Sequence, residues 1–162
     1  MKREEISFEY QVFDDASALT EADRSLLQKA KLATQTAYAP YSQFCVGATA
    51  LLANGATVSG SNQENASSPA GLCAERVVLA AAAASYPNIA IDTIAVSYNN
   101  KRTSISDRPV APCGICRQSL LETQLQQQTP VRLVLSGMEG KIFIINDIRH
   151  LLPLSFTAAD MG

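Results

Sequence analysis

Apolar and polar residues alternate with the spacing of β-strands in several short segments. The first such segment is N-terminal and predicts a strand or an ordered arm; its apolar positions are Ile6, Phe8, Tyr10 and Val12. Two apolar runs, residues 44–53 and 56–61, flank Asn54-Gly55, a strong signal for a β-hairpin. Three more strands are predicted for residues 91–98, 131–136 and 141–145.

Helical spacing appears between these segments. Thr20, followed by Glu21 and Asp23, is typical of a helix start, and the apolar positions that follow carry the helix to about Tyr38. Further helices are predicted for residues 73–85, 113–127 and 147–152, although Ser68-Pro69 leaves an earlier start open for the first of these. The run 77–84 is apolar on every side, which predicts burial between the sheet and another helix or a second subunit.

The order hairpin, helix, strand, helix, strand predicts an α/β layered fold with a mixed sheet. With 162 residues, 47% of them hydrophobic, the chain can form one core without disulfides. The net charge of −2 and the absence of a basic run argue against a nucleic-acid partner. No segment has the length and flanks of a signal peptide or membrane span, so we expect a cytoplasmic location and no membrane partner.

Three cysteines and one glutamate carry the clearest chemical signal. They lie in Cys73-Ala74-Glu75 and in Pro112-Cys113-Gly114-Ile115-Cys116. A catalytic zinc usually takes three protein ligands and leaves the fourth position to water, and Cys113 and Cys116 share one face if Pro112 begins a helix. Glu75 diverges from Cys73 on a helix and is therefore available for proton transfer. The pattern predicts a zinc-dependent deaminase with one Zn²⁺ per chain.

Three thiolates around Zn²⁺ leave a net charge of about −1, which opposes acidification of the bound water. The predicted compensation comes from Arg76, directly after Glu75, and from the two helix starts, with Arg117 as a weaker candidate.

Two other interpretations of the cysteines remain open. Cys45 could complete a structural four-cysteine zinc site, although its apolar, strand-like surroundings are typical of a buried free cysteine. The Cys113-Gly114-Ile115-Cys116 motif could instead be a redox dithiol, but this would leave Cys73-Ala74-Glu75 without a purpose.

Four segments together resemble cytidine deaminase: residues 39–44, 62–67, 73–76 and 112–118. The resemblance implies a three-layer fold with a mixed sheet of about five strands flanked by helices. It also implies an N-terminal extension, residues 1–18, before a single deaminase domain, residues 19–162. Where the family commonly has Tyr-Gly after Ser67, this chain has Ser68-Pro69, a change that bears on nucleoside preference and assembly.

The resemblance also implies roles for individual side chains. Glu75 is the general acid and base; Phe44 lies beside the pyrimidine, and Ala74 belongs to the substrate-binding residues. Asn62 and Glu64 match positions that hold the sugar 3′-hydroxyl, and alternation along a strand end places both on the same side. Phe156 resembles a C-terminal aromatic residue that reaches a neighbouring subunit's site.

The function so implied is hydrolytic deamination of cytidine and 2′-deoxycytidine to uridine and 2′-deoxyuridine, with release of ammonia, in pyrimidine salvage by a homotetramer. One alternative substrate is another aminopyrimidine nucleoside, such as a blasticidin-type antibiotic. Glu64 discriminates between the two, because a free ribose hydroxyl is what gives its carboxylate a role. A second alternative is a non-catalytic, zinc-stabilised binding module, in which Cys45 would matter as much as Cys73. The single histidine, His150, is expected at the surface rather than on the metal.

Overall fold

A mixed six-stranded sheet lies between helices in the computed structural model, which describes residues 1–162. The strand order is β1-β6-β5-β4-β2-β3, with β4 and β5 parallel and all other neighbours antiparallel. The strands are β1 (Gln11–Phe13), β2 (Phe44–Leu52), β3 (Thr57–Ser61), β4 (Ile91–Asn100), β5 (Arg132–Ser136) and β6 (Ile142–Ile145). The helices are α1 (Glu21–Ala33), α2 (Ala74–Ser85) and α3 (Gly114–Gln127).

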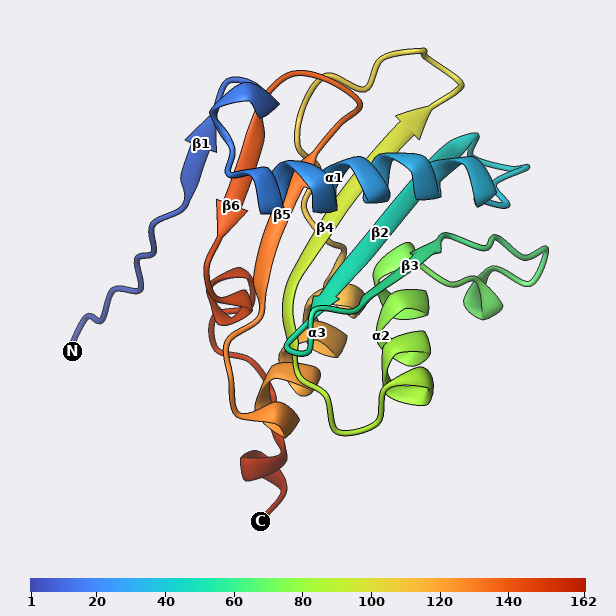
Figure 1. Ribbon diagram of the computed structural model, residues 1–162. Helices are drawn as coiled ribbons and strands as arrows, with labels where there is room; N and C mark the ends of the chain where they lie inside the picture. The colour runs from blue at the N-terminus through green and yellow to red at the C-terminus, as the bar shows by residue number, and fades with distance from the viewer.

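The helices form two layers, with α1 on one face of the sheet and α2 and α3 on the other (Figure 1). Strand alternation divides the core accordingly. Ala95 of β4 packs with Leu27 and Ala30 of α1, whereas its neighbours Ile94 and Val96 pack in the cluster that contains residues of α2 and α3. The three-layer prediction is confirmed. None of the helices combines the length and apolar character needed to cross a bilayer.

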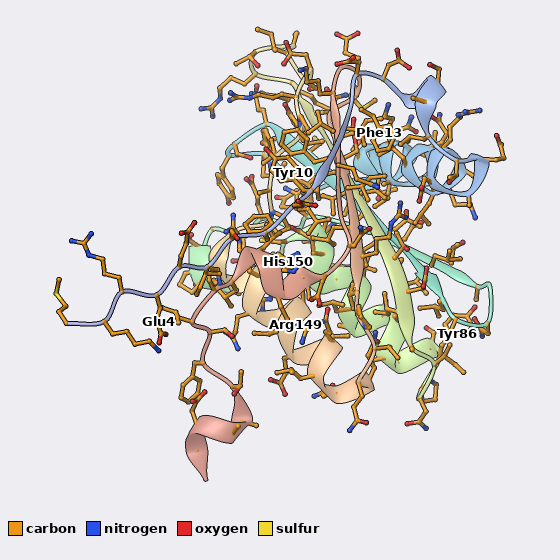
Figure 2. All side chains as sticks on the ribbon, turned by 90° about the vertical axis from the view of Figure 1, so that its left-hand side faces the viewer. Glu4, Tyr10, Phe13, Tyr86, Arg149 and His150 are labelled. Atoms are coloured by element: carbon orange, nitrogen blue, oxygen red, sulfur yellow. The ribbon has the colours of Figure 1, made fainter.

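The sheet has one strand more than the five predicted, because the N-terminal segment adds β1 antiparallel to β6. Before β1, the segment runs past His150 (Figure 2). Phe8 stacks on His150 with ring centroids 5.4 Å apart, and Tyr10 packs against Phe143 of β6 at 4.9 Å. His150 is thus half-buried beneath the arm rather than open on the surface.

Helix α1 begins where the sequence predicts and ends earlier. The Thr20 side chain accepts a hydrogen bond from the Asp23 backbone N–H at 3.2 Å, and Glu21 and Asp23 supply negative charge to the first turn. The α-helix stops at Ala33 and continues as a 3₁₀ turn to Thr36, short of the predicted Tyr38. The Asp23 carboxylate also accepts hydrogen bonds from Arg132, which ties α1 to the start of β5.

The predicted hairpin between β2 and β3 is confirmed, with a longer loop than Asn54-Gly55 alone suggests. The Leu52 N–H donates to the Ala56 carbonyl at 2.9 Å, so three residues form the loop. Within this loop only Gly55 has a positive φ, +84°. This is the loop type in which a glycine follows a type I turn in the left-handed conformation.

Both cysteine-bearing helices begin directly after the first cysteine of each motif. Cys73 and Cys113 are the N-cap residues of α2 and α3, and residues 68–70 form a separate 3₁₀ turn rather than an early start of α2. Along α2, Val78 and Ala82 are buried while Ala80 and Ala83 are exposed, so only one side of its apolar run is covered within the chain. Burial of the other side by a second subunit stays a prediction.

The close contact between α1 and β2 makes Gly47 a sensitive position. A Cβ atom there would lie 2.6 Å from the Thr34 N and closer still to the Ala30 carbonyl oxygen, both of them main-chain atoms. We expect Gly47→Ala to lower the free energy of unfolding by about 1–3 kcal/mol, the usual cost of overpacking, as measured by urea denaturation. Gly114→Ala is the matched control, because its methyl group would meet no atom within 4 Å. Equal losses in the two variants would contradict the packing argument.

Candidate metal and substrate site

The starts of α2 and α3 bring three sulfur atoms together, which we call the cysteine triad: Cys73, Cys113 and Cys116. The Sγ atoms of Cys73 and Cys113 are 3.9 Å apart, those of Cys113 and Cys116 are 3.6 Å apart, and all three lie within 4.8 Å of one another. Ligands about 2.3 Å from a tetrahedral zinc lie about 3.8 Å apart, so the triad fits three positions of such a site.

The fourth cysteine lies outside this group. Cys45 is buried in β2, only 3% exposed, and its sulfur atom is not part of the cluster that the three triad sulfurs form. All four cysteines are free thiols, and the sulfur separations in the triad are those of co-ligands rather than of a disulfide. The geometry favours a three-cysteine metal site over a structural four-cysteine site or a redox pair.

The protonation of the triad fits a cation. A hydrogen bond from the Cys116 thiol lowers the pKa of Cys73 to about 6, and the positive charge of Arg76 also contributes to this shift. The same hydrogen bond, together with burial, raises the pKa of Cys116. Without a metal, therefore, the Cys73 thiolate suppresses ionisation of Cys116, and a divalent cation between them would allow both to ionise.

Glu75 lies in the first turn of α2, only 5% exposed, and lines the cavity beside the triad. Burial raises the pKa of its carboxyl group, and hydrogen bonds from its own backbone N–H and from Cys116 oppose that rise. The cluster of possible metal ligands consists of the three sulfur atoms and includes no Glu75 oxygen. A carboxyl group with a raised pKa, beside a metal site rather than in it, is suited to accepting and returning a proton.

Cys73 and Cys113 of the triad line a cavity of about 940 Å³. Phe44 and Val46 of β2 and Val96 and Tyr98 of β4 line one side of it, on adjacent strands. Phe44 and Tyr98 stack with ring centroids 4.7 Å apart and planes 17° from parallel. The sequence analysis selected Phe44 but missed Tyr98, because the place of Tyr98 beside Phe44 depends on the register in which Val46 pairs with Tyr98.

Asn62 and Glu64 both line the cavity, but each is also held by the main chain. The Asn62 side chain accepts from the Val46 N–H at 2.8 Å and donates to the Phe44 carbonyl at 2.9 Å, which fixes the start of β2. The Glu64 carboxylate accepts from the backbone N–H groups of Tyr41 and Ser42, at 2.8 Å and 3.2 Å. The Ser42 side chain is the largest cause that lowers the pKa of Glu64; the backbone N–H groups of Tyr41 and Ser42 and the charge of Arg102 lower it further, so Glu64 is ionised at neutral pH.

The remaining predicted site residues differ in position. Arg76, Ser68 and Pro69 line the cavity. Ala74 is fully buried with its side chain in the core, so a substrate contact would involve its main chain. Phe156 is 61% exposed and does not line the cavity of its own chain.

Arg117 is fixed by two main-chain hydrogen bonds. Its guanidinium donates to the carbonyl oxygens of Pro112 and Leu151, at 2.8 Å and 2.9 Å. The side chain thus ties Pro112, the residue before the α3 N-cap, to Leu151 in the C-terminal part of the chain, and so anchors the start of α3.

Comparisons with known proteins agree with this site. A family model for the cytidine and deoxycytidylate deaminase zinc-binding region matches residues 20–130, which include the cysteine triad and Glu75. A cytidine deaminase from Halalkalibacterium halodurans is 38% identical over 141 residues, which cover 86% of this chain and 98% of that protein.

Solved structures give the same result. The chain resembles a cytidine deaminase from Burkholderia pseudomallei with 37% identity and a TM-score of 0.70, over 85% of this chain and 100% of the other. It resembles the cytidine deaminase from Mycobacterium tuberculosis with 32% identity and a TM-score of 0.63, over 82% and 95% of the two chains.

The cysteine triad predicts metal content directly. We expect about one zinc per chain by elemental analysis, lost in Cys113→Ala and retained in Cys45→Ala. Cys113 is exposed, so its truncation removes a ligand without opening a cavity in the core. Cys45→Ala is the control: it truncates a buried cysteine and should cost some stability but no metal. Loss of zinc from the Cys45 variant would instead support the four-cysteine structural site.

Proposed function

The chain belongs to the cytidine and deoxycytidylate deaminase family, and we propose that it catalyses the hydrolytic deamination of cytidine and 2′-deoxycytidine to uridine and 2′-deoxyuridine, with release of ammonia. The observation that carries this proposal is the buried carboxyl group of Glu75, in a cavity that also reaches the cysteine triad. Residues 19–162 form the single deaminase domain in this proposal, and residues 1–18 are an extension of it.

Cys73, Cys113 and Cys116 would hold the zinc ion. When bound, the zinc supplies Lewis-acid chemistry that makes water a nucleophile near neutral pH. The three thiolates leave excess negative charge, and two features of the chain offset it. The N-termini of α2 and α3, where Cys73 and Cys113 are the N-caps, carry a partial positive charge from their unpaired N–H groups. Arg76 contributes a full positive charge.

Glu75 transfers the protons. Its carboxylate accepts a proton from the attacking water and delivers it to N3 of the pyrimidine, which makes C4 a better electrophile. Glu75 then takes the proton of the hydroxyl group now on C4 and passes it to the amino group; the C4–N bond breaks, the C4 carbonyl forms and ammonia departs. A carboxyl group with an ordinary pKa would be a poor acid at neutral pH, so the burial that raises the pKa of Glu75 serves the second half of the reaction.

The cavity walls orient the nucleoside. The stacked pair Phe44 and Tyr98 offers an aromatic surface for the pyrimidine ring. Glu64, ionised and held by two backbone N–H groups, accepts a hydrogen bond from the sugar 3′-hydroxyl, and the remaining amide hydrogen of Asn62 donates to the same group. This arrangement favours nucleosides with a free 3′-hydroxyl over other aminopyrimidines.

We further propose that the chain acts as a homotetramer in pyrimidine salvage in the cytoplasm. Exposed apolar side chains surround the cavity, and a monomer rarely leaves such a rim open to water. They are Tyr41, Leu72, Val110 and Ile115. Phe156 is the residue proposed to reach a neighbouring subunit's cavity; the carbonyl oxygen of Phe156 accepts from the Gln118 side chain at 3.0 Å, which fixes its segment against α3.

Glu75→Gln tests the catalytic role with one atom changed. The variant keeps the size and polarity of the side chain and all three sulfurs, so we expect full zinc content and an unchanged fold. Turnover of cytidine, followed by ultraviolet absorbance, should fall by at least about 10⁴-fold, because one acid–base step contributes roughly 10²–10⁴-fold and Glu75 serves twice. Near wild-type turnover with full zinc would refute the mechanism, and unfolding with loss of zinc would make Glu75 structural.

Mixed assemblies test the shared site. We expect sedimentation equilibrium to give a mass of four 17.3 kDa chains. Phe156→Ala should lower activity and keep its zinc. Refolding Phe156→Ala chains together with Glu75→Gln chains should restore part of the activity, because some sites then combine an intact Glu75 with a neighbour's intact Phe156. A monomeric mass, or no recovery in the mixture, would contradict the assembly.

A further inference from the structure

The turn before β2 is held from two sides by groups of opposite charge. Residues 40–42 form this turn, and the Glu64 carboxylate accepts hydrogen bonds from the N–H groups of Tyr41 and Ser42. On the other side, the Arg102 guanidinium donates from Nη2 to the Tyr41 carbonyl oxygen at 2.7 Å. Arg102 lies in the loop between β4 and α3, far from Glu64 in the sequence.

One peptide group connects the two charges. The Tyr41 carbonyl oxygen and the Ser42 N–H belong to the same peptide unit, so Arg102 contacts its oxygen and Glu64 contacts its nitrogen. A positive charge at the oxygen polarises the unit and strengthens the hydrogen bond that its N–H donates. The Ser42 side chain contributes most to the lowered pKa of Glu64, and the positive charge of Arg102 adds a smaller lowering.

The rest of the turn adds rigidity but no charge. The Gln43 carbonyl accepts from the Lys101 N–H at 2.9 Å, and the Glu64 N–H donates to the Tyr38 carbonyl at 2.8 Å. These contacts are between main-chain atoms and survive any side-chain substitution that leaves the backbone in place. Arg102 is therefore the side chain of the β4–α3 loop that reaches the turn and could adjust Glu64 through it.

We propose that Arg102 is a positioning residue for the nucleoside sugar: it acts through the Tyr41–Ser42 peptide to keep the Glu64 carboxylate aimed at the 3′-hydroxyl. The proposal rests on the proposed function of Glu64. It assigns to the β4–α3 loop, which carries Val110 and Ala111 of the cavity wall, a second task at Glu64.

The measurement is the ratio of kcat/KM for cytidine to that for 3′-deoxycytidine, which lacks only the hydroxyl group in question. In the wild-type protein we expect a ratio of at least about 10, from a charge-assisted hydrogen bond. Arg102→Gln should reduce the ratio about two- to fivefold, the range for an exposed charge, with kcat/KM for 3′-deoxycytidine and zinc content unchanged. Arg102→Lys, which keeps the charge, should restore part of the ratio.

Lys101→Gln is the matched control, because it removes the same charge from the same loop and the Lys101 side chain makes no hydrogen bond to Tyr41; its ratio should equal that of the wild type. In a Glu64→Ala background, Arg102→Gln should change the ratio no further. Equal losses for both substrates in Arg102→Gln, or an unchanged ratio, would overturn the positioning role. A wild-type ratio near one would instead refute the sugar-binding role of Glu64 itself, on which the proposal rests.

Discussion

The rest of the site depends on one topological constraint: α2 and α3 begin at the same end of the parallel strands and on the same face of the sheet. Strands β3 and β4 both run antiparallel to β2 and are therefore parallel to each other, and β4 is parallel to β5. Each helix thus connects two parallel strands, and both crossovers move in the same direction across the sheet. Such crossovers are nearly always right-handed, which puts both helices on one face with neighbouring N-termini.

That constraint also creates an electrostatic problem that the site must solve. Three sulfur ligands and a carboxyl group gather in a partly buried volume, where like charges repel strongly. The helix N-termini that deliver the cysteines also supply partial positive charge at the same point, so geometry and compensation have one origin. Arg76 adds its charge from the residue next to Glu75, whose own neutral form is favoured by burial.

The elements and the grouping of the three cysteines could be predicted from sequence because their signals are local. The hairpin at Asn54-Gly55, the α1 start at Thr20 and the two cysteine motifs each lie within a few residues. Features that depend on distant partners were missed or incomplete. The pairing of β1 with β6, the stacking of Tyr98 on Phe44 and the contact of Arg102 with Tyr41 all join segments far apart in the chain. Local periodicity gives no information about such pairs before the strand order is known.

The short strand β1 matters beyond the strand it adds to the sheet. Its partner β6 has the sequence Ile142-Phe143-Ile144-Ile145, four consecutive residues that are both apolar and prone to β-structure. Left as the edge of the sheet, such a strand is a template for pairing with other copies of the chain, the first step of aggregation. During synthesis residues 11–13 emerge long before β6, so the segment that covers this edge is already present when the aggregation-prone strand β6 is made.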